Sequence, residues 1–166
     1  MPTALWIKRE DIVRNTVISG NVDTDKFLMS IKVAQEIHLQ NYTGTKLYDR
    51  ISNDILNNTL AGNYLSLVTD YLQPMLIHFA MTEYLPFAAF TVANGGVYKH
   101  TSENSVNAEK IEIDYLVEKE RTIAKYYTER FIDYMSFNQS LFPEYNANVN
   151  EDIYPDRDSR PASWVL

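Results

Sequence analysis

The fold is decided by residues 75–92, which read Met75-Leu76-Ile77-His78-Phe79-Ala80-Met81-Thr82-Glu83-Tyr84-Leu85-Pro86-Phe87-Ala88-Ala89-Phe90-Thr91-Val92. Apolar side chains occupy almost every side of a helix with this sequence, and a helix that is apolar all round lies at the centre of a protein. His78, Thr82 and Glu83 interrupt the run and distinguish it from a membrane span, which needs about 20 apolar residues. The stretch therefore predicts a central buried helix from Met75 to Val92.

Strong turn and helix-breaking residues bound this segment on both sides. Pro74 lacks an amide hydrogen and its ring clashes with the preceding turn, so a helix that begins near Tyr64 should break or kink near Gln73. Asn94-Gly95-Gly96 is the strongest turn signal in the chain and ends the helix. Residues 94–106 mix β-branched and polar side chains, which predicts a short loop or β-hairpin arm; a mobile surface loop is the alternative.

Helical periodicity flanks the central segment on both sides. Before it we expect a short helix at residues 9–16 and two helices at 24–42 and 45–57, joined by a tight Thr43-Gly44 corner. After it we expect a long helix at 107–137. The apolar stripe of that last helix is Ile111, Tyr115, Leu116, Ile123, Tyr126, Tyr127, Phe131, Tyr134 and Met135. The predicted fold is mainly α, a small helical bundle with a long C-terminal helix.

The character of the chain changes after Asn138. Residues 138–166 hold three of the chain's six prolines and show no helical period, yet aromatic residues recur among them. This pattern predicts an extended arm that docks on another protein, so we expect a helical domain at 1–137 and a docking arm at 138–166. The predicted interface residues are Tyr98, Phe142, Tyr145, Tyr154, Trp164 and Leu166.

Composition narrows the class of protein. The chain has 166 residues, the size of one ordinary domain, and no cysteine, which excludes disulfides and thiolate metal sites. Fifteen basic against 22 acidic residues give a net charge of −7, which argues against specific nucleic-acid binding. The N-terminus lacks the basic and apolar regions of a secretory signal. Twelve tyrosines suit half-buried subunit contacts.

No catalytic, cofactor-binding or metal-binding motif emerges from the residues. His38, His78 and His100 lie far apart, and neither helical histidine has a carboxylate three or four positions away on its own helix. No phosphate-binding glycine loop or nucleophile elbow is present. We therefore expect no enzyme, no cofactor and no metal, with a hidden enzyme site as a minor alternative. His78 is expected to be a hydrogen-bonded core residue, or else a buried pH-sensitive group.

Three stretches, taken with the order of the elements, carry a family resemblance. They are Asp25-Lys26-Phe27-Leu28 through Gln35-Glu36-Ile37-His38, then Tyr42-Thr43-Gly44-Thr45-Lys46-Leu47-Tyr48, and Asn94-Gly95-Gly96-Val97 before the Tyr-rich helix. A helix that ends in a Thr-Gly turn before a Leu-Tyr helix resembles the small helical head–tail connector (adaptor) proteins of tailed bacteriophages. The third stretch is similar to versions from phages of Bacteroidetes hosts, the crAss-like phages among them. The resemblance covers about residues 9–137.

The resemblance implies a structural virion protein that forms a homo-oligomeric ring, commonly a dodecamer, at the head–tail junction. Its partners would be the portal protein and the next tail or connector protein, and it would assemble in the host cytoplasm without contacting a membrane. DNA would pass through the ring without specific binding, which the acidic net charge suits because it repels the duplex. From the residues alone, a small cytosolic helical protein–protein interaction module remains the alternative.

Overall fold

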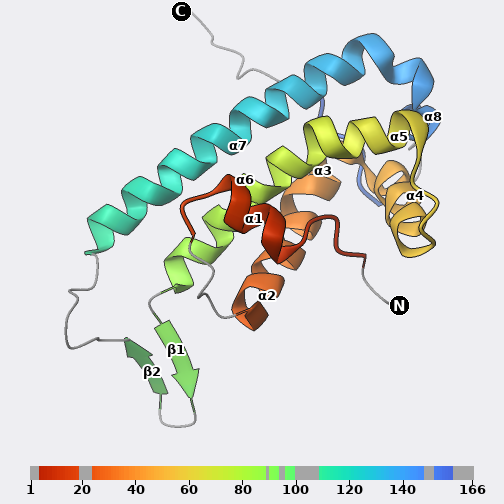
Figure 1. The fold of residues 1–166 in the computed structure, drawn as a ribbon. Coiled ribbons are helices and arrows are strands. Elements are labelled where there is room, and N and C mark those ends of the chain that lie inside the picture. Colours follow the sequence, from red (N-terminus) through yellow and green to blue (C-terminus); the bar gives the residue numbers. More distant parts are fainter. Residues whose placement is uncertain are drawn as a thin grey trace, which may run out of the picture.

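Helix α6 (Gln73–Tyr84) forms the centre of the structure, a computed structural model that describes residues 4–18, 24–88, 90–93, 96–99, 109–147 and 152–158 (Figure 1). It lies between α2 (Thr24–Ala34) and α7 (Lys110–Asn138). The Met75, Leu76 and Met81 side chains are fully buried there. The predicted mainly helical bundle with a central buried helix is confirmed.

The central helix ends earlier than predicted. A 3₁₀ turn, η3 (Leu85–Phe87), follows α6, and strand β1 (Phe90–Ala93) begins three residues later. The prediction of a helix to Val92 is wrong because aromatic and β-branched residues there favour a strand, and Asn-Gly is the preferred sequence for a two-residue hairpin link. β1 pairs antiparallel with β2 (Gly96–Lys99), with Phe90 opposite Lys99.

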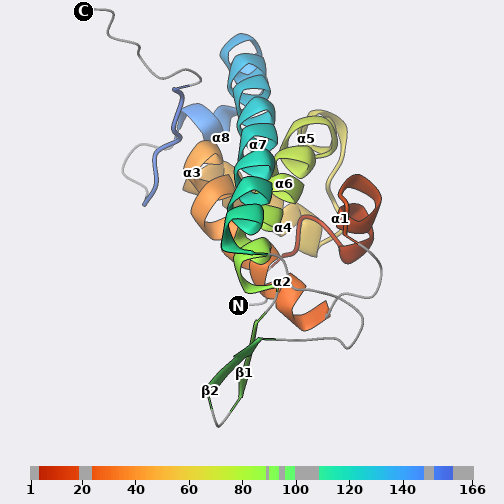
Figure 2. The ribbon, with the colours of Figure 1, turned by 90° about the vertical axis from the view of Figure 1, so that its left-hand side faces the viewer.

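Only β2 falls within the loop or hairpin arm predicted at residues 94–106, because its partner strand β1 precedes Asn94-Gly95-Gly96 in the stretch predicted as helix. The hairpin extends away from the helical body in both ribbon views (Figures 1 and 2). Residues 100–108, which complete the predicted insertion, lie outside the described residues.

Pro74 does not break its helix. α5 (Gly62–Leu67), the π-helical turn η2 (Val68–Leu72) and α6 follow one another without interruption (Figure 1). The amide of Gln73 donates to the carbonyl of Val68, five residues back. This wider turn accommodates the ring of Pro74 and tolerates the absence of an amide hydrogen on its nitrogen. The interruption predicted near Gln73 therefore takes the form of a π turn.

The first long helix has the same construction. α2 continues through the π-helical turn η1 (Gln35–Leu39) into α3 (Gln40–Thr43). Gly44 follows with φ of 74°, a conformation that glycine adopts without steric cost, and α4 (Thr45–Leu56) begins at the next residue. This is the predicted helix–helix corner. The short helix α1 (Arg9–Asn15), also predicted, contacts α2 and α6.

The C-terminal region folds back on the helical body and is not an arm over its described part. After α7 come the 3₁₀ turn η4 (Gln139–Leu141) and the short helix α8 (Pro143–Asn146). Phe142 and Tyr145 are buried, and their rings meet Tyr64 and Phe131 edge-on, with centroids 5.3 and 6.2 Å apart. The predicted boundary at residue 137 is therefore wrong, because these aromatic anchors complete the protein's own core.

Residues 152–158 also dock on their own chain. The amide of Thr45 donates to the carbonyl of Ile153 at 3.0 Å, and the amide of Asp156 donates to the carbonyl of Asn41 at 2.9 Å. The Arg157 guanidinium lies over the Tyr145 ring, 4.5 Å from its centroid, and donates to the Tyr145 carbonyl. These bonds hold the segment along the corner between α3 and α4.

Polar contacts fasten α8 to α4 and α5. The Tyr64 hydroxyl donates to Glu144 Oε2 at 2.6 Å, and Arg50 contacts Glu144 at 3.5 Å. Burial, followed by the hydrogen bond to Glu144, raises the pKa of the Tyr64 phenol from 10.0 to about 12. The neutral phenol is therefore part of the folded state at neutral pH.

We expect deletion of residues 139–166 to unfold the protein or to lower its melting temperature strongly. The deletion removes Phe142 and Tyr145 from the core, and the loss of one buried aromatic side chain costs about 3–5 kcal/mol against a typical total of about 5–15 kcal/mol. Far-UV circular dichroism on heating measures the effect. Deletion of residues 159–166 is the matched control, since it leaves every described contact of this region in place. Equal melting of the two truncated proteins would show that the segment is not part of the core.

The contribution of Tyr64 to stability should be present below pH 10 and should disappear as the pH rises from 10 to about 12. The unfolded phenol ionises near its ordinary pKa of 10.0 and the folded one near 12. Ionisation of the unfolded state therefore lowers the free energy of unfolding as the pH rises over that interval. Phenolate absorbance during an alkaline titration, compared between the wild type and Tyr64→Phe, isolates this group. A difference curve with its midpoint near the ordinary value would contradict the buried hydrogen bond to Glu144.

Candidate functional site

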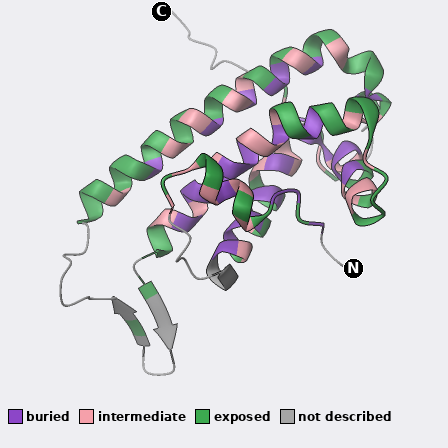
Figure 3. Cartoon of the chain, in the orientation of Figure 1, coloured by how far each residue is buried: buried purple, intermediate pink, exposed green. Residues whose placement is uncertain are grey.

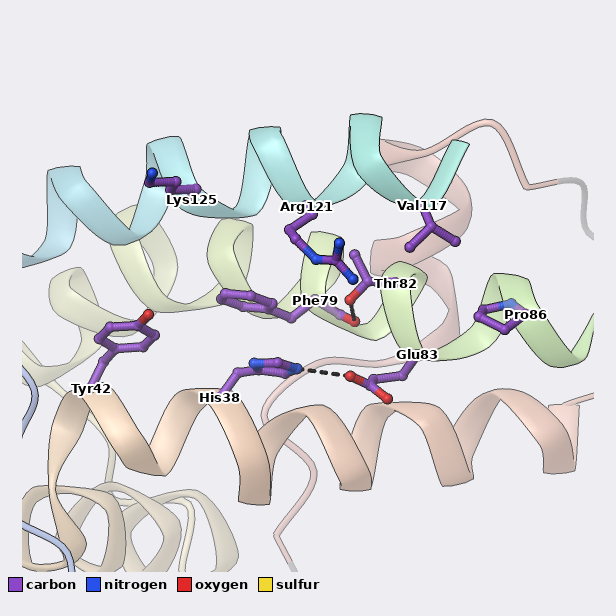
Figure 4. A pocket seen from close by; sticks show the side chains of 9 residues that line it. All are labelled: His38, Tyr42, Phe79, Thr82, Glu83, Pro86, Val117, Arg121 and Lys125. Carbon is purple, nitrogen blue, oxygen red and sulfur yellow. Dashed lines mark hydrogen bonds and ion pairs between the residues drawn. The ribbon is translucent and has the colours of Figure 1, made fainter. Parts of the chain in front are cut away.

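A pocket of about 480 Å³ opens between the helix α2–η1–α3, α6 and α7 (Figure 4). The His38 ring stacks on the Phe79 ring with centroids 4.1 Å apart, and His38 Nε2 lies 2.8 Å from Glu83 Oε1. The Thr82 hydroxyl donates to the Phe79 carbonyl at 2.7 Å. The polar groups on this side of the pocket are thus bonded within the protein.

Cationic side chains of α7 line the other side of the pocket. Arg121 pairs with Glu118 on its own helix, and Lys125 lies one turn further along (Figure 4). At the far end, burial and the nearby Asp156 raise the pKa of the Tyr42 phenol, which keeps it protonated. The histidine–carboxylate pair is an element of general-base catalysis, but the Thr82 hydroxyl in the pocket is engaged by a backbone carbonyl and the Tyr42 phenol stays protonated. The geometry suits the fastening of η1 to α6 better than catalysis.

A second histidine–carboxylate pair joins α6 to α7. His78 Nδ1 lies 2.6 Å from Glu120 Oε2, and the His78 ring is parallel to the Tyr127 ring at 5.6 Å. The expectation that His78 is hydrogen-bonded is confirmed, with a carboxylate of another helix as its partner. Together with His38 and Glu83, this pair links the central helix by side-chain hydrogen bonds to both of its neighbours.

The described part of the chain shows neither a metal cluster nor a helix that could span a membrane. No group of three or more histidine, aspartate and glutamate side chains there is placed to hold a metal ion. No helix among the same residues is long and apolar enough to cross a membrane. His100 lies outside the described residues.

The outer side of α7 carries a row of exposed apolar side chains. Ile111, Tyr115, Tyr126 and Phe137 keep 74%, 68%, 58% and 86% of their surface exposed. Successive members lie four or eleven positions apart, close to one and three helical turns, so they form one stripe along the helix. Figure 3 shows exposed residues recurring along the whole of α7. We call this stripe the α7 outer face, and it is the candidate interaction surface of the protein.

The α7 outer face was not separated from the core face by the sequence pattern. The predicted stripe placed Ile111, Tyr115 and Tyr126 together with Tyr127 and Phe131, but only the last two pack against the core. The signal that distinguishes the two sets is their phase on the helix. Residues 111, 115 and 126 lie nearly opposite residues 117, 124 and 131 at 100° per residue.

The structure describes the side chains of only three of the six predicted interface residues, namely Phe142, Tyr145 and Tyr154. Phe142 and Tyr145 are buried in the protein's own core, so they are not exposed anchors. Tyr154 is exposed, with the Arg157 guanidinium 5.2 Å from its ring centroid. Tyr98 lies in β2, where its side chain is outside the described part. Trp164 and Leu166 also lie outside the described residues.

These features define a small helical protein with a stripe of exposed apolar groups on its outer helix α7. A model of a family of unknown function, DUF6712, matches residues 39–154, and the chain belongs to this family. The match runs past the predicted boundary at residue 137 and includes α8, in agreement with the packing of Phe142 and Tyr145. No match was found among curated proteins or among solved structures.

We expect the His78–Glu120 pair to stabilise the fold more than the His38–Glu83 pair. The side chains of the former are 12% and 13% exposed and those of the latter 26% and 30%, and a buried polar group left without its partner costs about 1–3 kcal/mol. A double-mutant cycle with alanine at both positions of each pair, measured by denaturant unfolding, gives the two coupling energies. A larger coupling for His38 and Glu83 would contradict the ranking by burial.

Proposed function

We propose that this protein is a structural subunit that assembles with copies of itself into a ring, and that the ring is a head–tail connector of a tailed bacteriophage. The observation that carries the proposal is the α7 outer face, whose four large apolar side chains keep more than half of their surface exposed. The resemblance of residues 9–137 to connector proteins supports the second part. In this proposal the ring lies between the portal protein and the next tail or connector protein, at the head–tail junction of the virion.

The α7 outer face has the composition of a protein interface. Tyrosine and phenylalanine are enriched in interface cores, whereas single exposed apolar residues are common on any surface. Here four of them line one side of one helix. A buried aromatic side chain removes about 150–250 Å² from water, so the exposed parts of three rings and one isoleucine supply roughly half to three quarters of the roughly 800 Å² that each partner buries in a stable complex.

The charge of the chain fits a role around DNA without binding it. A net charge of −7 repels the duplex, so a ring of such subunits would let DNA slide through its channel. The proposed role needs no cofactor and no catalytic residue. It needs surfaces for a neighbouring subunit and for the two rings above and below.

We expect the purified protein to form a closed homo-oligomer of high cyclic symmetry, with twelve subunits as the number that the resemblance implies. Tyr126→Asp should shift the assembly toward monomers at equal concentration, because it places a charge in the interface, and should leave the melting curve of the monomer unchanged. Native mass spectrometry and particle images measure the assembly. Val17→Asp is the matched control, since Val17 is also an exposed apolar residue but follows α1 and belongs to neither α7 nor its outer face.

The same measurements separate the proposal from its alternatives. A wild-type protein that stays monomeric at all concentrations, or that forms only a dimer, would contradict the ring and favour an interaction module. The connector assignment is tested in particles. Antibodies against the protein should label the head–tail junction of the virion, and labelling elsewhere or none would overturn that assignment.

A further inference from the structure

A second exposed apolar stripe lies on the far side of the molecule from the α7 outer face. Met29 and Ile37, on α2 and η1, are 70% and 58% exposed, and the partly buried Val33 lies between them. Phe27, Ile31 and Leu39 of the same continuous helix point into the core. We call Met29, Val33 and Ile37 the α2 outer face.

The two outer faces point in opposite directions because of the order in which the helices pack. α6 packs extensively against α2 on one side and against α7 on the other, and Figure 1 shows it between them. Each outer helix turns its buried side toward α6, so its exposed side faces away from it. The molecule thus presents one apolar stripe on each of two opposite surfaces.

We infer that neighbouring copies of this chain pack head to tail, with the α7 outer face of one copy against the α2 outer face of the next. The inference rests on the proposed ring and names its subunit interface. A symmetric pair formed through α7 would bury the same face twice and leave the α2 outer face of both copies exposed. Head-to-tail packing covers both stripes in every copy, and it closes into a ring when the rotation between copies divides a full circle.

The two faces also suit each other in shape and charge. The α7 outer face consists mainly of rigid rings, and the α2 outer face of Met, Val and Ile side chains, which pack well against aromatic surfaces. Both faces lie on long helices, and α7 with its 29 residues extends over about 43 Å. Exposed charges of both signs border each stripe, Lys32 and Glu36 on one and Lys119 and Asp133 on the other.

The absence of cysteine from the sequence makes a direct test possible, since any introduced cysteine is the only thiol. One set of variants carries Tyr115→Cys or Tyr126→Cys on α7, and the other carries Met29→Cys or Ile37→Cys on α2–η1. The variants are treated with a short bis-maleimide, singly and in mixed pairs, after native mass spectrometry has shown that each still assembles. We expect covalent dimers from mixtures of the two sets. Either set treated alone should give no covalent dimer.

The control pair is Val17→Cys mixed with Tyr126→Cys, which should give no product. A chain with both Ile37→Cys and Tyr126→Cys should give a ladder of products that ends at the size of the ring. Cross-linking of Tyr126→Cys with itself, or no product from any of the four mixed pairs in protein that forms rings, would overturn the head-to-tail interface and leave the ring standing. A protein that does not assemble at all would overturn the proposed function first, and this inference with it.

Discussion

The rest of the structure depends on the need to cover α6 on all sides. Its side chains are apolar around the whole helix, so a single neighbour cannot remove them from water, and α2 and α7 cover it from opposite sides. Histidine–carboxylate pairs then fix each neighbour, His38 with Glu83 and His78 with Glu120. Once α2 and α7 are placed in this way, their remaining sides must face solvent or another protein. The two outer faces are therefore a consequence of the central helix.

The elements of the fold were largely predictable because they follow from local chemistry. The apolar run at residues 75–84 and the Thr43-Gly44 corner each act within a few residues, and both recur in the structure. The C-terminal segment was not predictable in the same way. Spaced aromatic anchors such as Phe142 and Tyr145 bury the same area in their own core as in another protein, and spacing alone does not distinguish the two destinations.

The candidate site was less accessible to sequence reasoning than the fold. The partners of His38 and His78 lie 45 and 42 positions away on other helices, so no spacing rule brings them together. On α7, the residues of the outer face and those of the core are mixed in one apolar series. Their phases on the helix separate them, but which phase faces inward depends on the position of α6. That information belongs to the tertiary structure.

In the proposed ring, each interface between neighbouring copies would be of modest area. The α7 outer face supplies only part of the area of a standard stable interface, so one pair of subunits should bind weakly. Closure of a ring adds one contact without a further loss of translational freedom, because the last contact forms within a single assembly. A scaffold that holds several copies side by side raises their effective concentration in the same way. In the proposed ring, weak pairwise contacts combined with closure would thus favour the complete ring over open chains of subunits.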